Sequence, residues 1–154
     1  MIIVKDRFQE YIQDNFDTHL LIILHEFLFY SIFIYYYYFG PIQDSQQNFQ
    51  IIKYILILFF IRYAFHYITV YSIINNKQDT DNIPEQTTYF QFNGKIALFT
   101  LFILFLSKGH NNAYFTLAII FSYALLTSAV KYGYTVDNLI TASITYFIFL
   151  LQII

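Results

Sequence analysis

The chain has 154 residues, of which 58% are hydrophobic and only 12% are charged, about half the charged fraction of an ordinary soluble domain. Its net charge of −2 leaves no basic field that could hold nucleic acid. The lack of cysteine excludes disulfides, thiolate metal sites and thiol catalysis. Composition therefore predicts an integral membrane protein and excludes a nucleic-acid-binding one.

Residues 1–19 precede the apolar part of the chain and are predicted to form a short amphipathic helix. Apolar side chains such as Ile3, Phe8 and Ile12 recur at helical spacing, and charged residues lie on the opposite face. A solvated leader that is only partly helical is the alternative. The segment is mixed in charge and contains acids, unlike a transit peptide or a secretory signal, so no targeting segment is expected.

Five apolar runs follow, most of them near the length that a helix needs to cross a hydrocarbon core about 30 Å thick. The predicted spans are about 20–39, 51–74, 90–106, 113–130 and 139–154. The third is the weakest, because its apolar part must recruit polar residues upstream; a re-entrant or tilted element is the alternative. Small residues in the fourth favour close packing inside a bundle. We therefore expect an all-α integral membrane protein, with a bundle of about five transmembrane helices forming a single domain over 20–154.

The first two apolar runs contain ionisable residues. His25 and Glu26 are adjacent in the first run, and Arg62, His66 and Thr69 share one helical face in the second. A charge near the bilayer centre is costly when unpaired, so each side chain should face protein or water and have a partner. If the two runs form a tight antiparallel hairpin, a count of about 1.5 Å per residue places Glu26 at a depth between Arg62 and His66. We therefore expect Glu26 to pair with Arg62, with both histidines close by.

Several roles are open for this charged set. It can hold two helices in register, relay protons, or contact lipid or quinone, and Lys131 is a further polar candidate. The two histidines lie on different helices and lack further ligands at metal-binding spacing. Nucleotide-binding, phosphate-binding and hydrolase motifs are missing from the sequence. No catalytic, cofactor-binding or metal-binding residue is therefore predicted, and an independent catalyst is not expected.

The choice of hydrophobic residues indicates the kind of genome that encodes the chain. It contains 16 Tyr, 19 Phe and abundant Ile but only 4 Gly. Codons for Phe, Ile and Tyr are rich in A and T, which favours an AT-rich mitochondrial genome of a ciliate-like protist. Small multi-span proteins from such genomes resemble subunits of respiratory-chain or ATP synthase complexes.

One local stretch carries a more specific resemblance. The segment LLTSAVKYGYTVDNL, residues 125–139, resembles the end of the last helix and the tail of the small 4L subunit of complex I. This resemblance implies a hydrophobic membrane-arm subunit of mitochondrial complex I, the NADH:ubiquinone oxidoreductase, that supports assembly and proton translocation. In that family, glutamates within the helices serve proton transfer, whereas residues 117–120 are apolar here. No family site is therefore carried over.

The resemblance also implies the partners, cofactors and location. The partners would be other subunits of a large inner-membrane complex together with lipids such as cardiolipin, and not nucleic acid. FMN, iron–sulfur clusters and ubiquinone would belong to the assembly, with none bound by this chain. A subunit of cytochrome c oxidase or of the ATP synthase membrane region has the same composition and is the alternative. A small transporter is a further alternative, although neither an inverted repeat nor a helix broken by Gly or Pro is visible.

The cations predict the orientation in the mitochondrial inner membrane. With five crossings, the loops on the N-terminal side carry five cations and the opposite loops carry two. Loops rich in Lys and Arg stay on the matrix or cytoplasmic side. The N-terminus is therefore predicted to lie on the matrix side.

Overall fold

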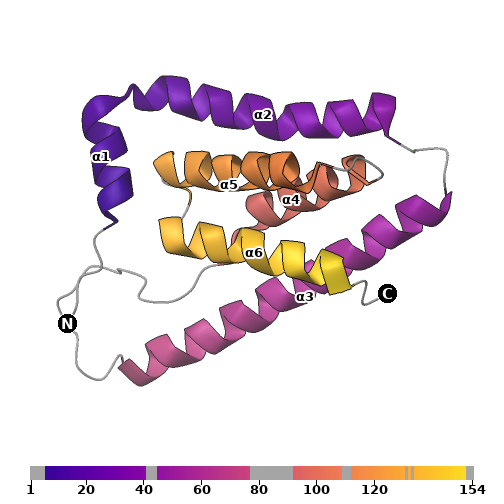
Figure 1. Ribbon diagram of the computed structural model, residues 1–154. Coiled ribbons are helices and arrows are strands. Elements are labelled where there is room, and N and C mark those ends of the chain that lie inside the picture. Colours follow the sequence, from indigo (N-terminus) through magenta and orange to yellow (C-terminus); the bar gives the residue numbers. More distant parts are fainter. Residues whose placement is uncertain are drawn as a thin grey trace.

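The computed structural model describes residues 6–40, 45–76, 92–108, 112–130, 132 and 134–151, and for residues 66 and 68–76 the backbone only. The regular secondary structure in these ranges is entirely helical. The helices are α1 (Arg7–Asn15), α2 (Thr18–Phe39), α3 (Ser45–Asn76), α4 (Gly94–Leu106), α5 (Ala113–Ala129) and α6 (Thr135–Leu151) (Figure 1). This confirms the all-helical prediction for the described part of the chain.

Polar side chains next to the helix ends decide where several helices begin. Asp6 accepts a hydrogen bond from the Gln9 amide at the start of α1, and Asp17 accepts one from the His19 amide at the start of α2. At α4 the acceptor is Asn93, which binds the Lys95 amide. Such caps satisfy amide groups that have no partner within the helix. The helix of the third apolar run therefore begins at Gly94, and residue 90, where the span was predicted to start, lies outside the described residues.

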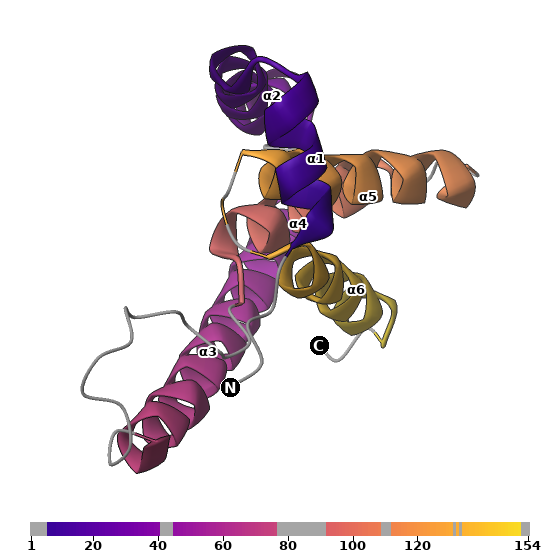
Figure 2. The same ribbon diagram turned by 90° about the vertical axis from the view of Figure 1, so that its left-hand side faces the viewer.

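Helix α4 occupies the centre of the bundle. It packs against α2, α3, α5 and α6, whereas α2 and α3 hardly touch each other. The end-on view in Figure 2 shows α4 between α2, α3, α5 and α6. Four residues of α4 are nearly inaccessible, namely Ile96, Ala97, Thr100 and Leu101. The third run was expected to be the least secure, yet it forms the middle of the core.

The apolar core has two parts that meet at α4. One part is built around Phe99, with residues from α2, α5 and α6. The other is built around Leu101 and Phe105, with residues from the end of α2, from the first two thirds of α3 and from α6. Ala124 and Ala142 are fully buried where α5 and α6 pack closely. Small residues at helix contacts permit this close approach.

Two helices are long and apolar enough to cross a membrane, namely α2 over Thr18–Phe39 and α3 over Ser45–Phe65. Only 22% and 17% of their apolar windows are buried, so most of their surface faces outward, unlike that of a core helix. Helices α4, α5 and α6 have 13, 17 and 17 residues, which corresponds to about 20 to 26 Å. Five crossings therefore stay a prediction, since three of the helices are shorter than a typical span.

Candidate functional site

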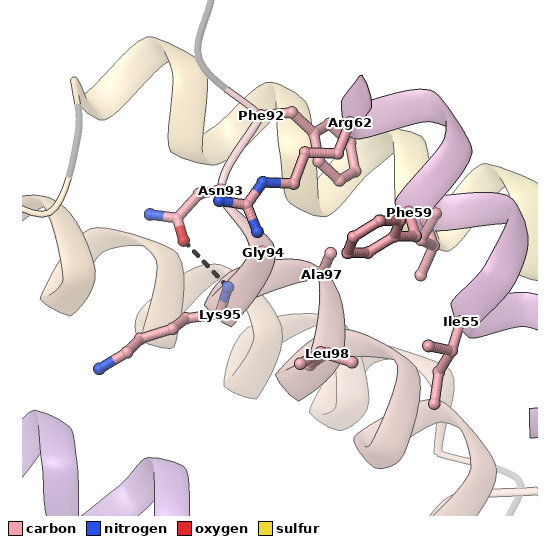
Figure 3. Close-up of a pocket in the computed structure, with 10 residues that line it drawn as sticks. Ile55, Phe59, Arg62, Phe92, Asn93, Gly94, Lys95, Ala97 and Leu98 are labelled. Carbon is pink, nitrogen blue, oxygen red and sulfur yellow. Dashed lines mark hydrogen bonds between the residues drawn. The ribbon is translucent and has the colours of Figure 1, made fainter. Parts of the chain in front are cut away.

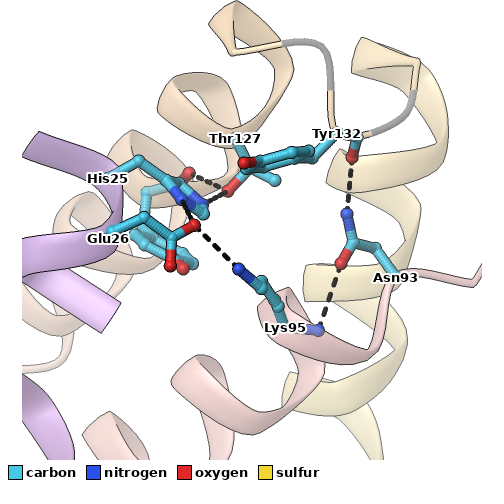
Figure 4. Close-up of polar contacts among 7 residues, drawn as sticks. His25, Glu26, Asn93, Lys95, Thr127 and Tyr132 are labelled. Atoms are coloured by element: carbon cyan, nitrogen blue, oxygen red, sulfur yellow. Dashed lines mark hydrogen bonds and ion pairs between the residues drawn. The ribbon is translucent and has the colours of Figure 1, made fainter. Parts of the chain in front are cut away.

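A chain of polar contacts links α2, α4 and α5 inside the bundle (Figure 4). The Lys95 ammonium lies 2.8 Å from Oε1 of Glu26, and the same oxygen lies 3.3 Å from Nδ1 of His25. On its other side, Nε2 of His25 lies 3.1 Å from the Thr127 hydroxyl. We call these four residues the polar network. It runs from the half-exposed Lys95 and Glu26 to the fully buried His25 and Thr127.

The Thr127 hydroxyl has two possible hydrogen-bonding orientations, and each one matches a different protonation state of the polar network. It lies 2.8 Å from the Tyr123 carbonyl and 3.1 Å from Nε2 of His25, and one hydroxyl donates only one hydrogen bond. When it donates to the carbonyl, Nε2 of His25 must carry a proton, and the Nδ1 contact with Glu26 then needs a second one. When it donates to Nε2, a neutral ring protonated at Nδ1 satisfies both contacts. Rotation of this hydroxyl therefore lets the same contacts serve two protonation states of the polar network that differ by one proton.

Aromatic rings fix the plane of the His25 imidazole. Its ring stacks on Tyr123 with a centroid distance of 5.0 Å and an interplanar angle of 16°. Tyr123 in turn stacks on Phe99 of α4 at 3.8 Å and 13°. The Lys95 ammonium lies 5.1 Å from the centre of the Tyr132 ring, within the range of a cation–π contact. The cationic end of the polar network is therefore held by an aromatic face as well as by a carboxylate.

Asn93 ties the polar network to the rest of the bundle. Its amide nitrogen donates to the Tyr132 carbonyl at 2.6 Å and to Oδ1 of Asn138 at 3.0 Å. Its backbone amide donates to the Thr141 hydroxyl at 3.2 Å. The same side chain caps α4. One residue thus joins the start of α4, the turn after α5 and the first turns of α6.

The predicted partner of Glu26 is wrong. Its ion pair is with Lys95, whereas Arg62 lies beside Gly94 at the start of α4. The depth count assumed that α2 and α3 form a tight hairpin, but α4 lies between them. Glu26 and Arg62 are therefore not paired, although the count along the sequence placed them at similar depths.

The other predicted site residues have different outcomes. His25 and Glu26 are in contact, as expected. The side chains of His66 and Thr69 and the whole of Lys131 lie outside the described residues. Within the described ranges, no group of three His, Cys, Asp or Glu residues gathers as a metal site would require.

Sequence reasoning missed three members of the site, namely Asn93, Lys95 and Thr127. Lys95 is one of the five cations counted in the loops on the N-terminal side, and Thr127 is one of the small residues of the fourth run that favour close packing. The signal that points to Asn93 is its position before Gly94 and an apolar run, since Asn is a favoured helix cap. No local signal in the sequence pairs Glu26 with a lysine 69 positions away.

No protein-family model, curated protein or solved structure matches this chain.

Proposed function

We propose that the chain is an integral membrane subunit of a larger assembly and that the polar network holds α2 against α4 and α5 within the membrane. The observation that carries this proposal is the distribution of polarity on α2. Its ionisable pair makes contacts with α4 and α5, on the side where Phe29, Ile32 and Tyr36 are buried, while the remaining surface of the helix is exposed and apolar. Such a helix suits a lipid environment on one side and a packed bundle on the other.

All five long helices cross the membrane in this proposal. The shorter helices α4, α5 and α6 pack against one another, with α2 against α4 and α5 and α3 against α4. A short span is accommodated by local thinning of the bilayer or by oligomerisation. Subunits that pack against the exposed faces of α2 and α3 would cover them in the assembly.

The favoured assembly is complex I of a mitochondrial inner membrane, with the N-terminus on the matrix side. Support comes from the resemblance of residues 125–139 to the 4L subunit and from a charged network inside a helical bundle, which suits a membrane arm that moves protons. FMN, iron–sulfur clusters and ubiquinone would be carried by other subunits. The ability of the Thr127 hydroxyl to serve either protonation state of the polar network supports a contribution to proton translocation in addition to a structural role.

Two fractionations test the proposal. Membranes are first washed with alkaline carbonate, which strips peripheral proteins, and the chain is expected to stay in the pellet. Membranes solubilised in a mild detergent are then separated on a native gel and analysed by mass spectrometry. Co-migration with NADH dehydrogenase activity is the expected result. Migration with cytochrome oxidase or ATP synthase would assign the chain to that complex, and migration as a small oligomer would favour a transporter.

A further inference from the structure

A pocket of about 330 Å³ lies between α3 and the start of α4 (Figure 3). One face of α3 provides apolar side chains at Ile55, Leu58 and Phe59 and ends in Arg62. The opposite wall includes Gly94 and Leu98 of α4. The pocket thus has an apolar interior and a guanidinium group at one end.

Arg62 has no carboxylate partner among the described residues. The ion pairs recorded there are those of Glu26 with His25 and with Lys95. Lys95 also lines the pocket, but its ammonium points away from Arg62 toward Glu26 (Figures 3 and 4). The charge of Arg62 therefore has no counter-ion in the part of the chain that the structure describes.

The surroundings of Arg62 increase the need for an anion. A Cβ at Gly94 would lie only 2.8 Å from Nη1 of Arg62, so the guanidinium rests directly on the first residue of α4. The N-terminal end of a helix carries partial positive charge, which repels a cation placed there. Arg62 also carries its charge near the end of the apolar stretch Ser45–Phe65 of α3, where lipid phosphates lie in the membrane placement proposed above. A phosphate group would compensate both the guanidinium and the helix end, because its oxygens match the fork of an arginine.

The apolar wall identifies the source of the phosphate. Phe59 is 65% exposed and continues the pocket onto the outward face of α3, where Leu56 and Phe60 are also exposed. A free phosphate ion would make no use of these side chains, whereas an acyl chain would cover them. An acidic phospholipid satisfies both ends of the pocket.

We propose that this pocket binds an acidic phospholipid, with its phosphate on Arg62 and an acyl chain along Ile55, Phe59 and Leu98. The proposal rests on the membrane placement proposed above. It adds a specific lipid site on α3 that is separate from the ion pair of the polar network.

The main test is native mass spectrometry of the full chain, reconstituted in equimolar phosphatidylglycerol and phosphatidylcholine and released in mild detergent. We expect the wild type to retain phosphatidylglycerol over phosphatidylcholine by about tenfold, and Arg62→Gln to lose this preference, since a hydrogen-bonded charge contact is worth about one to two powers of ten in affinity. The matched control is Lys53→Gln, which removes a cation from the same helix outside the pocket, where Lys53 faces Phe49. Equal losses in the two variants, or no loss in Arg62→Gln, would overturn the proposal.

A measurement on the wild type does not depend on how the variants fold. Phosphatidylglycerol with a photoreactive acyl chain should cross-link to peptides that contain residues 55–62 or 94–98. Cross-links spread evenly over α2 and α3 would contradict a specific site. No cross-link to these peptides, together with inorganic phosphate bound by the wild type but not by Arg62→Gln, would show that the pocket takes the free ion and not the lipid.

The carbonate wash and the lipid-binding measurement together distinguish a wrong lipid site from a wrong membrane placement. Release of the chain by the carbonate wash would refute the placement and the lipid site together. Retention in the pellet without selective lipid binding would refute the lipid site alone. The variant Leu98→Trp narrows the apolar part of the pocket and leaves Arg62 in place. It is expected to weaken the cross-link severalfold.

Discussion

His25 is the residue on which the interior of the site depends. It is fully buried, stacks on Tyr123 and has a hydrogen-bonding partner at each ring nitrogen. We expect His25→Ala to lower the free energy of unfolding by about 2 to 4 kcal/mol, because it leaves a cavity and removes a partner of the buried Thr127. Thermal unfolding in detergent measures this loss. His19→Ala is the control, since His19 is exposed on the same helix; a similar loss there would refute a specific role for His25.

Thr127 provides a second test at the level of a single hydroxyl. Thr127→Val keeps the shape but removes the group that lies between Nε2 of His25 and the Tyr123 carbonyl. We expect a loss of about 1 to 2 kcal/mol in the free energy of unfolding. Thr127→Ser should recover most of it, because the hydroxyl is restored. If Val and Ser variants unfold at the same temperature, the hydroxyl has no role in stability.

Variants of the ion pair between Glu26 and Lys95 can distinguish a structural role of the polar network from a role in proton transfer. Polar contacts between membrane helices couple only modestly, so we expect about 0.5 to 1 kcal/mol for this pair in a double-mutant cycle. The three variants are Glu26→Gln, Lys95→Met and the double variant, each compared with wild type by unfolding and, in the assembly proposed above, by proton pumping. If the pair only joins helices, the double variant should pump normally. If the polar network carries protons, Glu26→Gln should assemble but pump less.

At the level of helices, hydrogen bonds at the start of α4 connect this helix with α6 and with the turn after α5. Asn93 caps α4 and also binds groups from the turn after α5 and from α6, whereas Asn112 caps α5 with a single side-chain acceptor. A lost cap costs about 1 kcal/mol. We expect Asn112→Ala to cost about that much and Asn93→Ala about 2 to 3 kcal/mol, because buried polar partners are left unsatisfied. Equal losses in thermal unfolding would show that the contacts beyond the cap contribute nothing.

At the level of the whole molecule, the direction of each helix predicts which loops share a side of the membrane. The turn between α1 and α2 lies at the same end of the bundle as the starts of α4 and α6, and the turn after α4 lies at the other end (Figure 1). The chain has no cysteine, so single Cys variants can be labelled cleanly. With five crossings, an impermeant maleimide should label Asp14→Cys and Lys108→Cys from opposite sides of sealed inner-membrane vesicles. Labelling of both from the same side would refute the five crossings.

The positions of the helices could be predicted because they follow from local properties. Run length and apolar content placed helices at 20–39 and 113–130, close to the observed α2 (Thr18–Phe39) and α5 (Ala113–Ala129). The second run was predicted to start at residue 51, whereas α3 begins at Ser45. The first turns of α3 contain polar residues, which apolar content alone does not identify as helical. The ionisable pair His25 and Glu26 in an apolar run also indicated a polar site, because such a pair requires partners inside a membrane.

The sequence by itself determined that the chain is helical, rich in apolar runs of membrane length, and polar at His25 and Glu26. Only the tertiary structure decided that α4 is central and that Glu26 binds Lys95 instead of Arg62. The physical reason is distance along the chain: Glu26 and Lys95 are 69 positions apart, and His25 and Thr127 are 102 apart. Local periodicity fixes which face of a helix is polar, but the partner of that face depends on how the helices pack around α4.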